Sequence, residues 1–134
     1  MEVREAMHTP AVTTTAREKL SGAAARMLEY GISALAVVDD DGALTGIVTE
    51  RDLLRAIADG CSPRSTAVAR YLSRPPLTIE PETDSAVAAR LMAQYAVRHL
   101  PVCRAGRPVG MLEAQDLLLV DAWSHDGAAG PRRP

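Results

Sequence analysis

The sequence GIVTERDLL at residues 46–54 returns as GMLEAQDLL at residues 110–118. Both stretches begin with a glycine and two apolar residues, and both place an aspartate and two leucines after a short, mainly polar segment. This order predicts the end of a strand followed directly by the start of an amphipathic helix. One local structure is therefore encoded twice in a chain of 134 residues.

The likeness continues upstream of these stretches in a constant register. MHTPAVT at residues 7–13 lies over LSRPPLT at residues 72–78, a shift of 65 positions (72 against 7). Past the hairpin loops the shift falls to 64 (110 against 46), which indicates that the second loop is one residue shorter. An ordered series of matches with one deletion indicates an internal duplication.

Each copy predicts a β-α-β-β-α unit, so the expected fold class is α/β, with two tandem repeats related by an approximate twofold axis. A helix follows the first strand of each copy, beginning at a Thr15–Glu18 capping box in copy one and at Thr83 or Asp84 in copy two. Gly31 is placed to end the first of these helices. Strands are expected at 11–14, 34–38, 44–48, 77–79, 100–103 and 109–112, with closing helices near Glu50 and Ala114.

The duplication also sets the expected domain boundaries. Residues 3–58 form the first repeat and residues 67–120 the second, with a linker at 59–66 between them. Helix is expected at Thr66–Tyr71, where the second repeat begins. The tail at 124–134 is rich in Gly, Pro, Ala and charge, and is expected to be disordered.

Composition excludes several classes of function. The net charge is −2 and aromatic residues make up 3 %, so the sequence offers neither a basic footprint nor a stacking platform for nucleic acid. No apolar run reaches membrane-spanning length and the first residues lack a signal-peptide pattern, so a cytoplasmic protein is expected. No phosphate loop or nucleophile elbow occurs, and no carboxylate pair stands out as an acid–base couple. We therefore predict no catalytic residue.

Thr49 and Asp52 are the strongest candidates for contact with a ligand. A helix that starts just after Thr49 presents unpaired backbone N–H groups and a positive dipole end, both of which favour phosphate. Asp52 can accept hydrogen bonds from two sugar hydroxyls. The same Thr-x-x-Asp spacing also forms a capping box, so a structural role and a binding role both remain open.

The corresponding positions in copy two are Glu113 and Asp116. Glu113 places a carboxylate where phosphate would approach, so a phosphate there needs compensating charge. Arg98 and His99 could supply that charge from the preceding strand edge. Arg98 is equally readable as a solvated surface charge, and His99 as a structural histidine. We expect the second cleft to bind phosphate more weakly than the first.

No metal site is predicted. The histidines at positions 8, 99 and 125 show no ligand spacing with cysteines or acids. Asp39–Gly42 lacks the spacing of a calcium loop and is interpreted as a solvated hairpin turn. Cys61 and Cys103 have no metal or redox spacing and are interpreted as ordinary thiols.

These motifs resemble the paired CBS domains first named from cystathionine β-synthase. The likeness is carried by GISALAVVD at 31–39 and VRHLPV at 97–102, together with the two strand–helix stretches quoted above. Ala36 departs from the proline usual in the family, which Pro101 keeps. The resemblance covers about residues 3–120.

The resemblance implies two sheets that face each other, with two clefts that in relatives often hold AMP, ADP, ATP or S-adenosylmethionine. It implies that Asp52 and Asp116 receive ribose hydroxyls and that Thr49 helps to hold ribose or phosphate. The first strands, which carry Thr13 and Thr78, would read the adenine through backbone groups.

The expected function is a non-enzymatic regulatory module that binds an adenosine-type ligand, requires no cofactor and signals to a partner on a separate chain. The alternative is a dimeric scaffold protein whose clefts hold no physiological nucleotide. Neither nucleic acid nor a membrane is expected as a partner. A homodimer is expected, because exposed apolar helix faces usually mark interfaces, and the residues expected on these faces are Ala24, Met27, Leu28, Leu91 and Met92.

Overall fold

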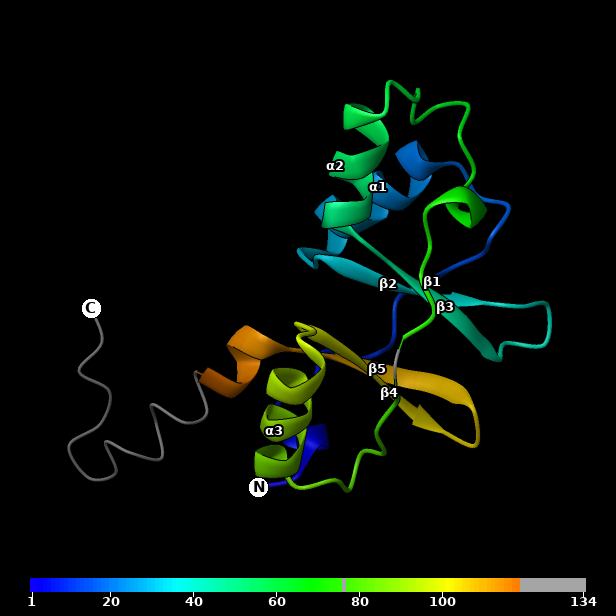
Figure 1. Cartoon of the computed structure of the whole chain (residues 1–134). Coiled ribbons are helices and arrows are strands. Elements are labelled where there is room, and N and C mark those ends of the chain that lie inside the picture. The colour runs from blue at the N-terminus through cyan, green and yellow to red at the C-terminus, as the bar shows by residue number, and fades with distance from the viewer. Residues whose placement is uncertain (76, 119–134) are drawn as a thin grey trace.

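Two small β-sheets face each other at the centre of the molecule, and helices cover their outer sides (Figure 1). The computed structural model describes residues 1–75 and 77–118, so the expected disorder of the tail at 124–134 concerns residues outside the described part. After the short N-terminal helix η1 (Val3–Glu5), the first half contains β1 (Thr13–Thr14), α1 (Leu20–Tyr30), β2 (Ala34–Val38), β3 (Leu44–Thr49) and α2 (Glu50–Ala58). The second repeat begins with η2 (Val68–Arg70), which packs in the first half, and the second half contains α3 (Ser85–Tyr95), β4 (His99–Arg104), β5 (Arg107–Glu113) and helical residues 114–118.

The two sheets have the same plan. In the first sheet β1 runs parallel to β2, and β2 is antiparallel to β3. In the second sheet β4 and β5 are antiparallel, and a single parallel bridge between Ile79 and Val102 stands where the first sheet has β1. The apolar inner faces meet at Ala36, Ile47 and Met111, which seal the contact between the halves. The α/β fold with two tandem repeats is confirmed.

The first strand of each repeat is shorter than the sequence predicts. The strand expected at 11–14 is reduced to Thr13–Thr14, and the one expected at 77–79 to the bridge at Ile79. Prolines precede both segments and lack the N–H that a ladder requires. The chain crosses over from the opposite half before each of these segments. Only the last residues of each segment therefore lie next to a strand and pair with it.

Helix α1 begins at Leu20, so the capping box predicted at Thr15–Glu18 is wrong. Its N-cap is Lys19, which makes no side-chain capping bond. The cause is tertiary: residues 15–18 form a separate turn, and backbone bonds from the residues around Val68 fix this turn, including Val68 N–H to Glu18 O at 2.7 Å. The other predicted caps are observed. Gly31 ends α1 with a left-handed φ of 64°, and the Asp84 side chain accepts from a backbone N–H of α3.

Each half has its own apolar core, and each core contains a segment that belongs to the other repeat. Val3, from η1, is fully buried in the second half with Leu100 and Leu112. Val68, from η2, is fully buried in the first half with Leu20. Of the helix predicted at Thr66–Tyr71, only Val68–Arg70 is helical, as a single 3-10 turn, so the longer helix is wrong.

We call residues 1–8 and 66–73 the crossing segments. Backbone hydrogen bonds fix both of them to the opposite half: Val3 N–H donates to Thr83 O at 2.8 Å, and Leu20 N–H donates to Thr66 O at 2.9 Å. Each segment passes so close to a strand that the strand needs a glycine. A Cβ on Gly46 would lie 3.0 Å from the carbonyl oxygen of Ser73, and a Cβ on Gly110 would lie 2.9 Å from that of His8.

The apolar surface differs from the one predicted. Met27 and Met92 are core residues, 4 % and 5 % exposed, so their assignment to an exposed face is wrong. Their side chains turn inward because each is needed to fill the space between helix and sheet. In the described part of the chain, the large apolar residues that do remain exposed are Met1, Leu28, Tyr30, Leu54, Ile57, Tyr95 and Leu118. No helix within residues 1–75 and 77–118 is long and apolar enough to cross a membrane.

Candidate functional site

A cavity of about 970 Å³ opens between the two halves, at the N-terminus of α2. One wall comes from the first half and the crossing segment beside it. The other wall comes from the end of α3, the start of β4 and the end of β5 in the second half. The polar residues that line it are Ser33, Thr49, Glu50, Arg51, Asp52, Arg55, Ser73, Arg98, His99, Glu113 and Gln115.

Thr49 and Asp52 form the capping box that their spacing predicts. The Thr49 N–H donates to Asp52 Oδ2 at 2.8 Å, and the Asp52 N–H donates to Thr49 Oγ1 at 3.4 Å. Asp52 is only 4 % exposed, and its second oxygen lies 3.4 Å from Nη1 of Arg55. The structural role is therefore real. Both residues also line the cavity, so a ligand in the cavity can contact the capping box.

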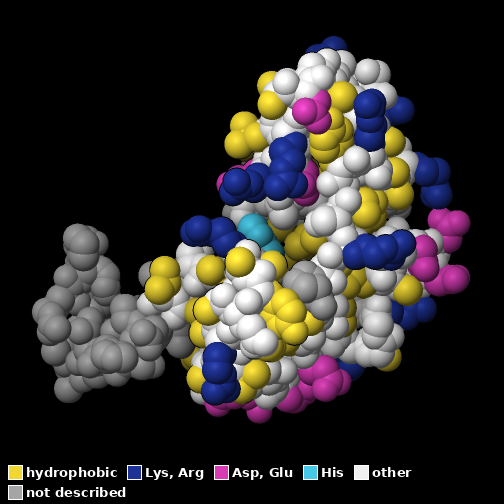
Figure 2. Space-filling view, in the orientation of Figure 1, with side chains coloured by type: hydrophobic (Ala, Val, Ile, Leu, Met, Phe, Trp, Pro, Cys, Tyr) yellow, Lys and Arg dark blue, Asp and Glu magenta, His cyan; other side chains and the backbone are white. Residues whose placement is uncertain are grey.

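Positive charge gathers around the mouth of the cavity. Arg51 and Arg55 project from α2, and Arg98 faces them from the second half. Figure 2 shows basic side chains on both sides of the hollow between the halves, with histidine between them. All three arginines are exposed, so they can move to meet an anion, although Arg55 would leave its contact with the buried Asp52 to do so. Glu50 and Glu113 add negative charge to the same walls.

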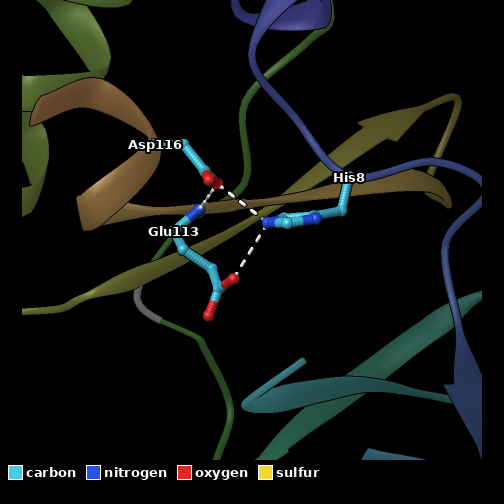
Figure 3. Close-up of side chains that lie close together, drawn as sticks. All are labelled: His8, Glu113 and Asp116. Atoms are coloured by element: carbon cyan, nitrogen blue, oxygen red, sulfur yellow. Dashed lines mark hydrogen bonds and ion pairs between the residues drawn. The ribbon is translucent and has the colours of Figure 1, made fainter. Parts of the chain in front are cut away.

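In the second repeat Asp116 lies close to His8, not in the large cavity (Figure 3). The Glu113 N–H donates to Asp116 Oδ2 at 2.9 Å, which reproduces one half of the capping box of the first repeat. Nε2 of His8 lies 2.9 Å from Glu113 Oε2 and 3.2 Å from Asp116 Oδ2. The crossing segment thus brings a histidine to the start of the second closing helix.

Glu113 connects this cluster with the cavity wall. Its Oε1 accepts from the Ser33 hydroxyl and lies 3.4 Å from Nε2 of His99. Ser33 Oγ is also within 2.7 Å of that nitrogen. Burial lowers the pKa of His99, against the opposing effect of the Glu113 carboxylate. Burial therefore favours the neutral form of His99, which is a hydrogen-bonding group in the wall.

The structure brings together four of the seven predicted site residues. Thr49, Asp52, Arg98 and His99 line the cavity. Three others lie elsewhere. Asp116 is in the His8 cluster, and Thr78 is exposed. The backbone carbonyl of Thr13 accepts a hydrogen bond from Nη1 of Arg26 at 2.8 Å.

Sequence reasoning missed Ser33, Ser73 and His8. Ser33 directly precedes β2 and lies well before the Thr49–Asp52 motif in the sequence, so the spacing of that motif does not indicate it. A signal for the other two was present in the internal alignment, where His8 lies over Ser73 at the shift of 65 positions (73 against 8). Because the two repeats are equivalent, these residues must occupy equivalent places.

A family profile described as CBS domain matches the chain twice, at residues 3–59 and 68–122. The chain is also 31 % identical over 127 residues to the CBS domain-containing protein YhcV of Bacillus subtilis, covering 94 % of this chain and 89 % of that one. The chain belongs to the CBS domain family. CBS domain pairs are generally regulatory, non-catalytic modules.

Other relatives are longer or more distant. An uncharacterized protein of Methanopyrus kandleri, MK0525, is 28 % identical over 125 residues, covering 92 % of this chain. The chain spans 64 % of that relative's length, and only 17 % and 14 % of two others. Among solved structures, the CBS domain pair of protein MJ0100, in complex with 5'-methylthioadenosine and S-adenosyl-L-methionine, shares the fold with a TM-score of 0.83 at 23 % identity, covering 90 % of this chain and 95 % of that one.

Proposed function

We propose that this chain is a non-enzymatic regulatory module that binds an adenosine-type ligand in the cavity at the N-terminus of α2. The observation that carries the proposal is the convergence, in one cavity, of a helix N-terminus with a hydroxyl, a buried carboxylate and three arginines. A cavity of about 970 Å³ is of the size that small-molecule sites have. The adenosyl ligands of the MJ0100 pair are consistent with this chemistry.

Each group has a defined task in the proposed complex. Asp52 accepts hydrogen bonds from the ribose hydroxyls, and Thr49 with the first N–H groups of α2 meets a phosphate or carboxylate. The arginines at the mouth neutralise further negative charge. Glu113 on the opposite wall limits how much anionic charge the cavity accepts, because like charges at short range repel.

Regulation requires that the ligand distinguish between two arrangements of the protein. The cavity is lined by both halves, so a ligand that contacts both walls favours one relative placement over others. We propose that a partner on a separate chain reads this placement. We also propose that the protein is cytoplasmic.

Calorimetric titration of the full chain with AMP, ADP, ATP and S-adenosylmethionine tests the proposal. Leaving the sugar contacts unmade costs about 1.5–3 kcal/mol, so Asp52→Ala should weaken binding roughly ten- to a hundredfold. Asp84→Ala is the matched control, because it removes a helix-capping carboxylate, that of α3, outside the cavity. Thermal unfolding of both variants separates lost binding from the lost helix cap. If the parent chain binds none of these compounds, or Asp52→Ala binds them equally well, the proposal fails.

One observation favours a second role, as a dimeric scaffold. Leu28 of α1 is 85 % exposed, and Leu54 and Ile57 of α2 are 65 % and 61 % exposed. These side chains lie on neighbouring helices of one half, so they offer an apolar surface of the kind that pairs with a second copy. Sedimentation of the parent and of Ile57→Glu tests this role. We expect a dimer that the charge converts to monomers, and a parent that is already monomeric at micromolar concentration would contradict it.

A further inference from the structure

The cluster of His8, Glu113 and Asp116 contains three side chains that can bind metal ions, and they come from three different segments (Figure 3). His8 belongs to the first crossing segment, Glu113 ends β5, and Asp116 lies in the helical residues 114–118. One ligand atom from each residue lies within 4.8 Å of the other two. A single ion can therefore reach all three.

The protein leaves the imidazole of this cluster incompletely satisfied. Nε2 of His8 is shielded from solvent and makes no well-aligned hydrogen bond within the described part of the chain. It lies beside the carboxylate oxygens of Glu113 and Asp116, so it faces the space between two acceptors. Glu113 is only 7 % exposed, and buried carboxylates and buried ring nitrogens are costly unless they are paired. A cation held among the three groups satisfies all of them.

Comparison of the two repeats shows that this set is specific to one of them. His8, Glu113 and Asp116 stand where the first repeat has Ser73, Thr49 and Asp52. The first repeat thus has two hydroxyl residues that line the same cavity as its aspartate, whereas the second has an imidazole and a second carboxylate. Hydroxyls beside a helix N-terminus suit an anion. An imidazole with two carboxylates suits a cation.

We propose that His8, Glu113 and Asp116 bind one divalent transition-metal ion. One imidazole nitrogen and two carboxylate oxygens form a donor set suited to Zn²⁺, Co²⁺ or Mn²⁺ rather than to a soft monovalent ion. Three protein ligands leave a coordination position for water. The Ser33 hydroxyl holds the other oxygen of Glu113, which is the kind of outer contact that fixes a metal-binding carboxylate.

Titration of the full chain with Co²⁺ tests the proposal, because its visible spectrum reports the donor atoms. We expect one equivalent per chain, displaced by Zn²⁺, without the near-ultraviolet thiolate band that Cys61 or Cys103 would give. His8→Gln should lower the affinity about 100-fold or more, since even outer contacts of metal ligands cost 10–100-fold. Asp40→Asn is the matched control: it removes an exposed carboxylate from a hairpin loop and should leave the affinity unchanged.

Each other outcome overturns the proposal. If the chain takes up no Co²⁺ beyond the weak binding that exposed acids give, the cluster is not a metal site. A thiolate band would place the metal at a cysteine instead. If His8→Gln unfolds, Glu113→Gln, which keeps the side-chain volume, must show the same loss of affinity. The titration contains no nucleotide, so its failure would leave the proposed adenosine site standing.

Discussion

Truncation of Val3 to alanine should unfold the chain more easily, although this residue lies near the N-terminus. Its side chain is fully buried in the core of the second half, in contact with residues such as Leu100 and Leu112. The substitution removes two buried methyl groups, each worth about 0.8 kcal/mol of transfer free energy, and leaves a cavity. We expect a loss of roughly 2–3 kcal/mol, a large share of the typical stability of about 5–15 kcal/mol.

Urea unfolding followed by circular dichroism, at one fixed protein concentration, measures this loss. With a slope of about 2 kcal/mol per molar urea, the middle of the usual range, the midpoint should fall by roughly 1–1.5 M. Val68→Ala is the matched control, because Val68 fills the equivalent place in the first core and should cost a similar amount. A change below about 0.5 kcal/mol for Val3→Ala, the range of surface substitutions, would refute the conclusion that the N-terminal segment completes the second core.

Two further predictions concern a close approach and a buried thiol. Gly110→Ala should lower the thermal midpoint, because its Cβ would meet the His8 carbonyl oxygen at 2.9 Å and a backbone atom cannot swing aside; such overpacking costs about 1–3 kcal/mol, and an unchanged melting curve would contradict the contact. Cys61 should react with a disulfide reagent at once, whereas Cys103 should react only on unfolding. Cys103 is 5 % exposed and burial raises the pKa of its thiol, so little thiolate forms. If both cysteines of the native chain react at the same rate, β4 must open and the prediction is wrong.

Periodicity in the sequence predicts the hairpins and the closing helices, because their signals are local. Apolar runs between loops with turn residues place β2 and β3 within one residue, and the Thr49 cap marks the start of α2. The start of α1 was mispredicted for the opposite reason. Tertiary bonds to the residues around Val68 hold residues 15–18 in a separate turn, and they override a capping box that is favourable by itself.

The residues of the candidate sites also divide into those with a local signal in the sequence and those without one. Thr49 and Asp52 were predictable because they lie three positions apart on one helix end. Spacing rules for metal ligands could not find His8, because its partners are far along the chain, and only its alignment with Ser73 marked it. Met27 and Met92 show the same limit for surfaces, since helical periodicity identifies an apolar face but cannot say which neighbour covers it.

The crossing segments have a consequence for the history of the chain. Two separate copies of a single repeat could exchange these segments in the same manner, so the molecule has the form of a symmetric dimer whose subunits became joined. In such an ancestor the residues at positions 8 and 73 were one residue in two identical clefts. Once the subunits were joined, each position could change alone. The difference between Ser73 and His8 is the result of such separate change. A single repeat expressed today would have to form a dimer to fold, because each core includes a crossing segment from the other repeat.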